Sequence, residues 1–214
     1  QTLYGMADLF IIGQFEGVAS TTAVSIGSQV MHMLTVMLVG LAMGATVSIA
    51  QATGRGAKKD ASAAIGNTVT LFMSLSVVLL FVLLVLRGSI VSVMSTPEEA
   101  VSGTLDYLTI CFIGIPFITA YNIIASIFRG LGDSKSPMYF IAVACVVNIA
   151  LDYYFMGTLR LGPAGAALGT TLSQAVSVVI SLAVIRKKQL IAVRRADLHP
   201  CRSVMEKLLK IGVP

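Results

Sequence analysis

The sequence predicts an all-α integral membrane protein, a bundle of six transmembrane helices. Of its 214 residues, 56% are hydrophobic and only 12% are charged, and the charged share is about half that of a soluble domain. Charged residues divide the chain into six long apolar segments, and a helix needs about 20 apolar residues to cross a bilayer. The runs are unbroken, whereas the strands of membrane barrels alternate over about ten residues.

The first expected span covers residues 1–15 and contains one charged residue, Asp8. A helix of this length would rise only about 22 Å, so we interpret the segment as a span that lacks its start. An aspartate in its middle argues against a signal peptide. The second span is expected over 23–53, after an outer loop of Gly, Ser and Thr at 17–22. This loop takes up the excess length of a run too long for one crossing.

The remaining spans are expected at about 61–86, 105–128, 137–156 and 161–185. Pro116 removes a backbone donor within the fourth span and should kink it. Residues 1–186 would therefore form one six-helix lobe. Residues 187–214 would be a cytoplasmic linker followed by the start of a seventh helix.

Lysine and arginine residues predict the orientation in the membrane. Thirteen of the fifteen follow the second, fourth and sixth spans, and only Arg87 and Arg160 lie on the other side. Because short loops rich in Lys and Arg stay in the cytoplasm, these three loops are expected there. The net charge of +5 is thus explained by the Lys and Arg residues that orient the chain in the membrane. It does not indicate nucleic-acid binding, which needs basic residues clustered with aromatic residues on an exposed face.

Two aspartates well inside the spans, Asp8 and Asp152, are candidates for function. Each lies eight residues before the outer end of its span, which places both carboxylates about 12 Å below the outer boundary. Asn148 lies one turn deeper than Asp152 on the same helix face, and Thr170 reaches a similar level on the sixth span. Oxygen atoms gathered in a low-dielectric pocket suit a small cation such as Na⁺ or an exchangeable proton. The alternative interpretation treats Asn148 and Thr170 as contacts between helices.

Small residues on the sixth span support this convergence. Gly165 and Gly169 are spaced so that a neighbouring helix backbone can approach closely, which would bring Thr170 near the fifth span. A weaker expectation is a substrate cavity that adapts to varied ligands, although methionine at helical spacing is also usual in simple packing. Its candidate lining residues are Gln29, His32, Met33, Tyr121, Asn122 and Gln174.

The segment Gly130-Leu-Gly-Asp133 resembles the signature of intramembrane aspartyl proteases, whose paired aspartates act as general acid and base. However, Arg129 and Lys135 flank it, and Ser136-Pro137 follows. These neighbours place it in a cytoplasmic loop at a helix start. We therefore expect a glycine-rich turn in which Asp133 or Ser134 caps the next helix, and we do not expect an enzyme.

Four motifs follow one another in a specific order: Leu3-Tyr-Gly-Met-Ala-Asp8, Phe128-Arg-Gly-Leu-Gly-Asp-Ser-Lys-Ser-Pro137, Asn148-Ile-Ala-Leu-Asp152 and Gly162-Pro-Ala-Gly-Ala-Ala-Leu-Gly-Thr170. In this order they resemble the multidrug and toxic compound extrusion (MATE) transporters. The resemblance implies a twelve-helix antiporter of two six-helix lobes around a central cavity. This sequence would be the amino-terminal lobe.

The resemblance also implies a function, partners and site residues. Such a transporter exports organic, cationic or amphiphilic drugs and toxins across the plasma membrane of a bacterium or archaeon, in exchange for Na⁺ or H⁺. Its partners would be small organic molecules, the lipid bilayer and the missing carboxy-terminal lobe, with no cofactor. Carried over by position, Asp8, Asn148, Asp152 and Thr170 fall on the cation site of the amino-terminal lobe. The backbone of Ala166 is a weaker candidate.

Two further alternatives stay open. A lipid-linked oligosaccharide flippase of the same superfamily would need a more cationic cavity for pyrophosphate, and no Lys or Arg lies within an expected span. A membrane scaffold without transport activity would not need Asp8 and Asp152 at one depth.

Overall fold

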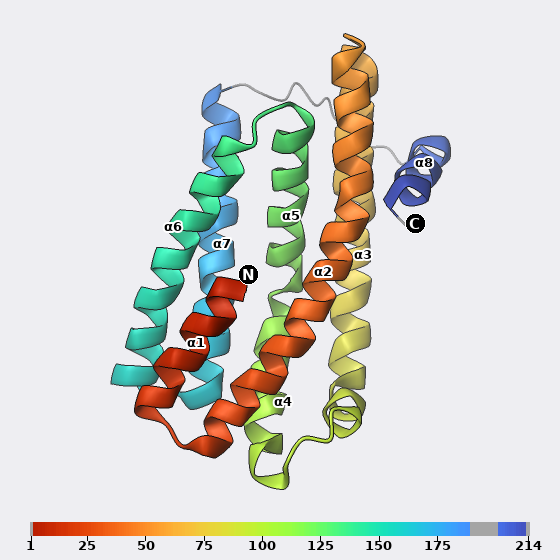
Figure 1. Cartoon of the computed structure of the whole chain (residues 1–214). Helices are drawn as coiled ribbons and strands as arrows, with labels where there is room; N and C mark the ends of the chain where they lie inside the picture. Colours follow the sequence, from red (N-terminus) through yellow and green to blue (C-terminus); the bar gives the residue numbers. More distant parts are fainter. Residues whose placement is uncertain (1, 189–200, 213–214) are drawn as a thin grey trace.

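The computed structural model describes residues 2–188 and 201–212, and helices account for nearly all of this part of the chain (Figure 1). The predicted all-α fold class is confirmed. Residues 189–200, which fall in the linker expected from residue 187 onward, lie outside the described residues. The helices are α1 (Thr2–Phe15), α2 (Val18–Gly54), α3 (Lys58–Val93), α4 (Glu98–Ile113), α5 (Ile115–Gly130), α6 (Lys135–Asp152), η1 (Tyr153–Thr158), α7 (Gly162–Lys188) and α8 (Arg202–Gly212).

Several of these helices are long and apolar enough to cross a membrane: α2, α3, α6 continued by η1, and α7. α4 and α5 meet the same test as one bent span, and α1 contributes a shorter apolar helix. α2 and α3 have 37 and 36 residues, so each is about 55 Å long and extends beyond a hydrocarbon layer of about 30 Å. The chain is a multi-pass membrane protein.

The connections between these helices alternate between the two ends of the bundle (Figure 1). Residues 55–57 and 131–134 lie at the same end as the last turn of α7, and residues 94–97 and 159–161 lie at the opposite end. The basic-rich segments therefore share one end. Their placement in the cytoplasm stays a prediction. Within the bundle, α7 packs against α4, α5 and α6, while α1 contacts α2, α6 and α7.

The prediction of a loop at 17–22 is wrong, because α2 already begins at Val18. The backbone N–H and the hydroxyl of Thr21 both donate to the Gly17 carbonyl, each at 3.1 Å. The Ser20 hydroxyl donates to a Glu16 carboxylate oxygen at 3.4 Å. These short polar side chains bond to groups in and before the first turn. The polar composition therefore marks a helix start rather than a loop.

The fourth span bends by 48° between α4 and α5, as predicted from Pro116. The break itself lies at Gly114, because Pro116 occupies the first turn of α5, where a missing N–H removes no intrahelical bond. A methyl group at Gly114 would lie 2.7 Å from the Thr171 side chain, so α7 is in close contact with the bend.

The fifth span changes to π-helix directly after Asp152, forming η1. The sequence analysis did not predict this change. Single π-helical turns within α-helices often occur at functional sites.

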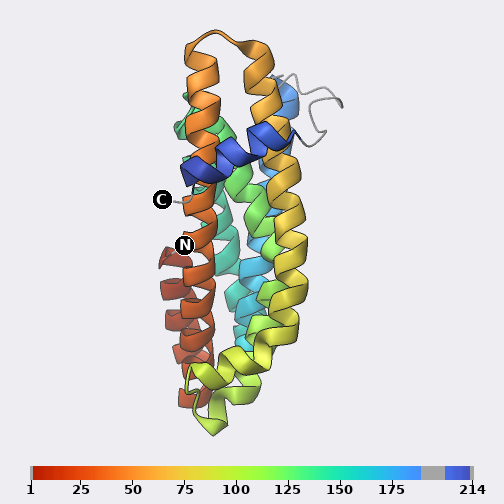
Figure 2. The same ribbon diagram turned by 90° about the vertical axis from the view of Figure 1, so that its right-hand side faces the viewer.

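The residues expected to start a seventh helix form α8, which lies across α2 and α3 rather than along the bundle (Figure 2). Leu208 is only 2% exposed. The backbone N–H of Cys201 donates to the Asn67 side-chain oxygen on α3 at 2.7 Å. α8 is therefore held against the bundle by the buried side chain of Leu208 and by a hydrogen bond from the residue just before its start.

Candidate cation site

Three helices bring four of the predicted side chains together: Asp8 on α1, Asn148 and Asp152 on adjacent turns of α6, and Thr170 on α7. The Thr170 hydroxyl donates to Oδ2 of Asp8 at 3.1 Å. The Asn148 amide donates to Oδ1 of Asp8 and to Oγ1 of Thr170, at 3.5 Å each. Asp8, Asn148 and Asp152 are at most 1% exposed. The four residues form one buried polar cluster.

Asp8 and Asp152 belong to the same cluster, because Asn148, one turn before Asp152 on α6, donates to Asp8. Two buried ionised carboxylates repel each other, and a proton or a cation between them relieves this repulsion. An unpaired charge in the interior costs several kcal/mol. The geometry therefore favours binding of a positive charge.

Several buried acceptor atoms of the cluster have no hydrogen-bond donor among the described residues: both Asp152 carboxylate oxygens, the Asn148 side-chain oxygen and, one turn from Thr170, the Gln174 side-chain oxygen. Native proteins rarely leave buried polar atoms unsatisfied. Oxygen acceptors of this kind are the ligands that hard cations prefer, and a protonated carboxyl group could also donate to them. The donor set fits Na⁺ or a proton.

A glycine on α7 makes room for the Asp152 carboxylate. A methyl group at Gly169 would overlap Oδ1 of Asp152, and one at Gly165 would lie 3.2 Å from the Phe155 backbone. The close helix approach predicted from the glycine spacing is thus confirmed. Ala166 is fully buried one turn before Thr170. Its carbonyl lies within the regular helix, where it already accepts an N–H bond.

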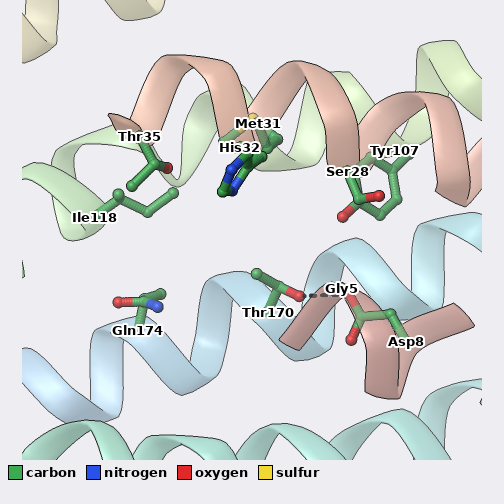
Figure 3. Close-up of a pocket in the computed structure, with 10 residues that line it drawn as sticks. All are labelled: Gly5, Asp8, Ser28, Met31, His32, Thr35, Tyr107, Ile118, Thr170 and Gln174. Atoms are coloured by element: carbon green, nitrogen blue, oxygen red, sulfur yellow. Dashed lines mark hydrogen bonds between the residues drawn. The ribbon is translucent and has the colours of Figure 1, made fainter. Parts of the chain in front are cut away.

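A cavity of about 50 Å³ reaches the cluster from one side (Figure 3). This volume is large enough to hold water. Asp8 and Thr170 line it together with Gln174 and residues of α2, whereas Asn148 and Asp152 do not. A cation that enters through this cavity therefore meets Asp8 and Thr170 before it meets Asp152.

The six predicted substrate residues do not line one cavity. Gln29 and Met33 line a cavity of about 300 Å³ between α1 and α2. Tyr121 and Asn122 line another of about 510 Å³ between α2, α5 and α6. Gln174 borders only the small cavity, and His32 borders all three. These residues are spread over adjoining spaces because each helix presents different faces to different neighbours.

The sequence analysis missed several residues that line these cavities. Ser28 and Thr35 lie on the same face of α2 as His32, and their spacing could have revealed them. Tyr107 also lines the small cavity. Its ring packs against Gly27, where there is no side chain; a methyl group there would overlap the ring.

Arg129, which the sequence analysis assigned to a loop, is helical in the structure. It lies in the last turn of α5 and lines the 510 Å³ cavity beside Tyr121 and Asn122. One guanidinium nitrogen donates to the Ser126 hydroxyl at 3.4 Å, and the buried Nε has no acceptor among the described residues. α5 continues two residues past the predicted end of the span at 128. Arg129 is therefore part of the helix and lines the cavity, instead of lying in the loop.

Asp133 caps a helix, as predicted. One carboxylate oxygen accepts the backbone N–H groups of Lys135 and Ser136, at 3.1 and 3.0 Å, and the other accepts the Ser136 hydroxyl at 2.6 Å. These contacts satisfy donors at the start of α6. They account for Asp133 without a protease mechanism.

Comparisons with known proteins agree with this architecture. The chain is 29% identical over its whole length to "Probable multidrug resistance protein YoeA" of Bacillus subtilis. It is 31% identical to "Probable multidrug resistance protein NorM" of Thermotoga maritima, again over 100% of this chain. It covers 48% and 47% of these two proteins. The chain thus spans about half the length of the curated relatives it matches.

A solved structure and a family model complete the comparison. The crystal structure of a MATE protein in the bent conformation matches with a TM-score of 0.94 and 28% identity, over 100% of this chain and 48% of that chain. The MatE family model matches residues 1–154. The chain therefore belongs to the MatE family, a family of transporters rather than enzymes.

Proposed function

We propose that this chain is one lobe of a cation-coupled antiporter that exports organic drugs and toxins, with Na⁺ or H⁺ as the coupling ion. The observation that carries the proposal is the buried polar cluster that contains two carboxyl groups, Asp8 and Asp152, with Asp8 on the wall of a small cavity. Asn148 and Thr170 supply further oxygen atoms, and the backbone of Ala166 is a weaker candidate.

The membrane potential would supply part of the driving force. An inward-moving cation gains about 2.3 kcal/mol per charge per 100 mV. Its binding between Asp8 and Asp152 would neutralise charge and favour the helix arrangement in which the carboxyl groups stay close. If drug and cation prefer different arrangements, they need not share any ligand atom.

The proposed substrates are cationic or amphiphilic organic molecules. This follows from the multidrug resistance named for the relatives and from the two larger cavities, whose walls combine apolar side chains with Gln29, Tyr121 and Asn122. The proposed location is the plasma membrane of a bacterium or archaeon. Because the chain covers about half of its relatives, we propose a second lobe as the partner that closes the central cavity.

The lipid-linked oligosaccharide flippase stays a second candidate because of one observation. Arg129 places a guanidinium group, which binds phosphate well, on the wall of the 510 Å³ cavity. A pyrophosphate headgroup carries more negative charge than one guanidinium group neutralises, so export of drugs remains the better-supported proposal.

Transport by the complete protein in proteoliposomes tests the proposal. A fluorescent organic cation is supplied, and Na⁺ and H⁺ gradients are imposed separately. We expect uptake to follow one of the two gradients and to stop when that gradient is collapsed. Uptake that ignores both gradients would contradict cation coupling, and transport of a lipid-linked sugar instead of the dye would favour the flippase.

A further inference from the structure

The cavity of about 510 Å³ holds an arginine but no acidic residue among its described lining residues. Arg129, in the last turn of α5, places a guanidinium group on its wall. The small cavity has the opposite character, because Asp8 lines it and, among the described residues, no Lys or Arg does. The larger cavity therefore suits a ligand whose charge is opposite to that of the coupling cation.

The described part of the chain satisfies little of this guanidinium group. Arginine carries five side-chain N–H donors, and one of them binds the Ser126 hydroxyl at 3.4 Å. The buried Nε has no acceptor among the described residues. The carboxylate of Asp133, four residues later, accepts from Lys135 and Ser136 at the start of α6. Because Arg129 is itself partly exposed, its remaining donors can reach a ligand in the cavity.

Arg129 lies toward one end of the cavity. The end of α5 meets the connection at residues 131–134, at the end of the bundle that carries the basic-rich segments (Figure 1). Tyr121 lies eight residues earlier on α5, which is about 12 Å farther from that end. Three helices contribute the apolar lining residues: Val36, Val39, Ala125, Pro137, Met138 and Ile141. The cavity thus combines a charged end with an apolar wall.

The polar side chains farther along α5 already donate to the backbone. The Tyr121 hydroxyl donates to the Pro137 carbonyl at 3.0 Å, and the Asn122 amide donates to the Ile118 carbonyl at 2.8 Å. Neither side chain carries a charge at neutral pH. The guanidinium group of Arg129 is therefore the strongest attachment point that the described residues offer to an anionic group in this cavity.

A phospholipid with one negative charge matches these features. Ligand pockets of about 300–1,000 Å³ are mostly apolar, and a few polar groups fix the orientation of the ligand. A phosphodiester group carries one negative charge, and a guanidinium group binds phosphate through paired hydrogen bonds. The cavity is open to the outside of the lobe. Its charged end lies where we expect the cytoplasmic leaflet, which attracts basic groups through its anionic lipids.

We propose that this cavity binds one anionic phospholipid of the cytoplasmic leaflet, with the phosphodiester group on Arg129 and an acyl chain along the apolar wall. The lipid is a bound partner in this account and not a transported substrate. The inference goes beyond the proposed antiport function and shares with it only the expected orientation in the membrane, since the lipid binds without a gradient or a drug.

The first measurement is lipid retention by the complete purified transporter, followed by native mass spectrometry. The transporter is reconstituted in vesicles of equal amounts of phosphatidylglycerol and phosphatidylcholine with the same acyl chains, extracted, and analysed for bound lipid. We expect the wild type to retain phosphatidylglycerol several-fold over phosphatidylcholine, and Arg129→Gln to lose this preference. Equal retention of both lipids by the wild type, or an unchanged preference in Arg129→Gln, would overturn the proposal.

Lys59→Gln is the matched control for surface charge. Lys59 is an exposed residue near the start of α3, at the same end of the bundle, and lies outside this cavity. Its variant loses the same charge and should keep the preference for phosphatidylglycerol. A loss as large as that of Arg129→Gln would overturn a specific site. If Arg129→Gln does not fold, Arg129→Met keeps an unbranched apolar stem and is held to the same expectation.

The second measurement separates a lipid from a free anion. Inorganic phosphate has no apolar part, so a large excess of it should leave the retained phosphatidylglycerol in place. Displacement by inorganic phosphate would overturn the lipid proposal and indicate a simple anion site. Neither measurement uses an ion gradient. Failure of cation-driven transport would therefore refute the antiport function alone, whereas loss of the lipid preference in the wild type would refute the lipid site alone.

Discussion

At the scale of single residues, the carboxyl pair depends on a glycine. Gly169 lets the backbone of α7 approach α6 so closely that any side chain at 169 would overlap Asp152. Thr170, the next residue, then faces Asp8 and donates its hydroxyl hydrogen at 3.1 Å. Gly169 and Thr170 act together, because the close helix approach at Gly169 sets the distance at which Thr170 contacts Asp8.

Gly169→Ala should therefore disturb the site directly. The added methyl group must displace the Asp152 carboxylate, and overpacking of this kind costs about 1–3 kcal/mol. We expect cation-driven efflux per molecule of folded transporter to fall sharply. Gly40→Ala is the matched control, because a Cβ there meets nothing within 4 Å and alanine favours the helix by up to about 1 kcal/mol. Efflux by Gly169→Ala equal to that of Gly40→Ala would contradict the packing described for α6 and α7.

At the scale of helices, the ends and junctions determine which residues reach the site. α6 begins at Lys135 with its first donors bound by Asp133, and it ends at Asp152, where the π-helical η1 starts. The helix thus carries Asn148 and Asp152 on its last two turns, opposite Asp8 of α1.

Asp133→Ala should weaken the start of α6 without affecting chemistry. Loss of a helix cap costs about 1 kcal/mol, which corresponds to about 2–4 °C in Tm for a chain of this size. We expect this decrease in a thermal-unfolding assay, with unchanged efflux per folded molecule. Asp133→Asn keeps an acceptor oxygen and should lose less. A variant that stays fully stable but loses all activity would point to a chemical role for Asp133.

The convergence of Asp8, Asn148, Asp152 and Thr170 could be predicted from the sequence, because regular helices of known rise fix the depth of each residue in the membrane. The start of α2 at Val18 could not, since serine and threonine suit both loops and helix starts. Arg129 was misassigned because charge alone does not show where a helix ends. The division of the substrate residues among three cavities depends on side-chain packing, which no spacing in the sequence encodes.

At the scale of the whole molecule, the alternation of connections between the two ends of the bundle is what the distribution of Lys and Arg requires. We expect a cysteine placed near Lys58 or Lys187 to react with a membrane-impermeant reagent only from the cytoplasm. A cysteine near Glu98 should react only from outside. Labelling of all these positions from the same side would contradict the six-span arrangement.

The central claim is that the Asp8 and Asp152 pair couples export to a cation. Asp152→Asn and Asp8→Asn keep the shape of each side chain but remove the charge that holds a proton or Na⁺. The double variant should lose little more than either single one, because groups that act as a unit are not additive.

The most direct measurement is drug efflux by these variants of the complete transporter, normalised to the amount of protein in the membrane. The account predicts that efflux falls to near background in both single variants while folding and membrane level persist, and that Thr170→Ala, which removes one neutral oxygen, causes a milder loss. Full efflux in both Asp→Asn variants would contradict the account and show that the two carboxyl groups only pack the lobe.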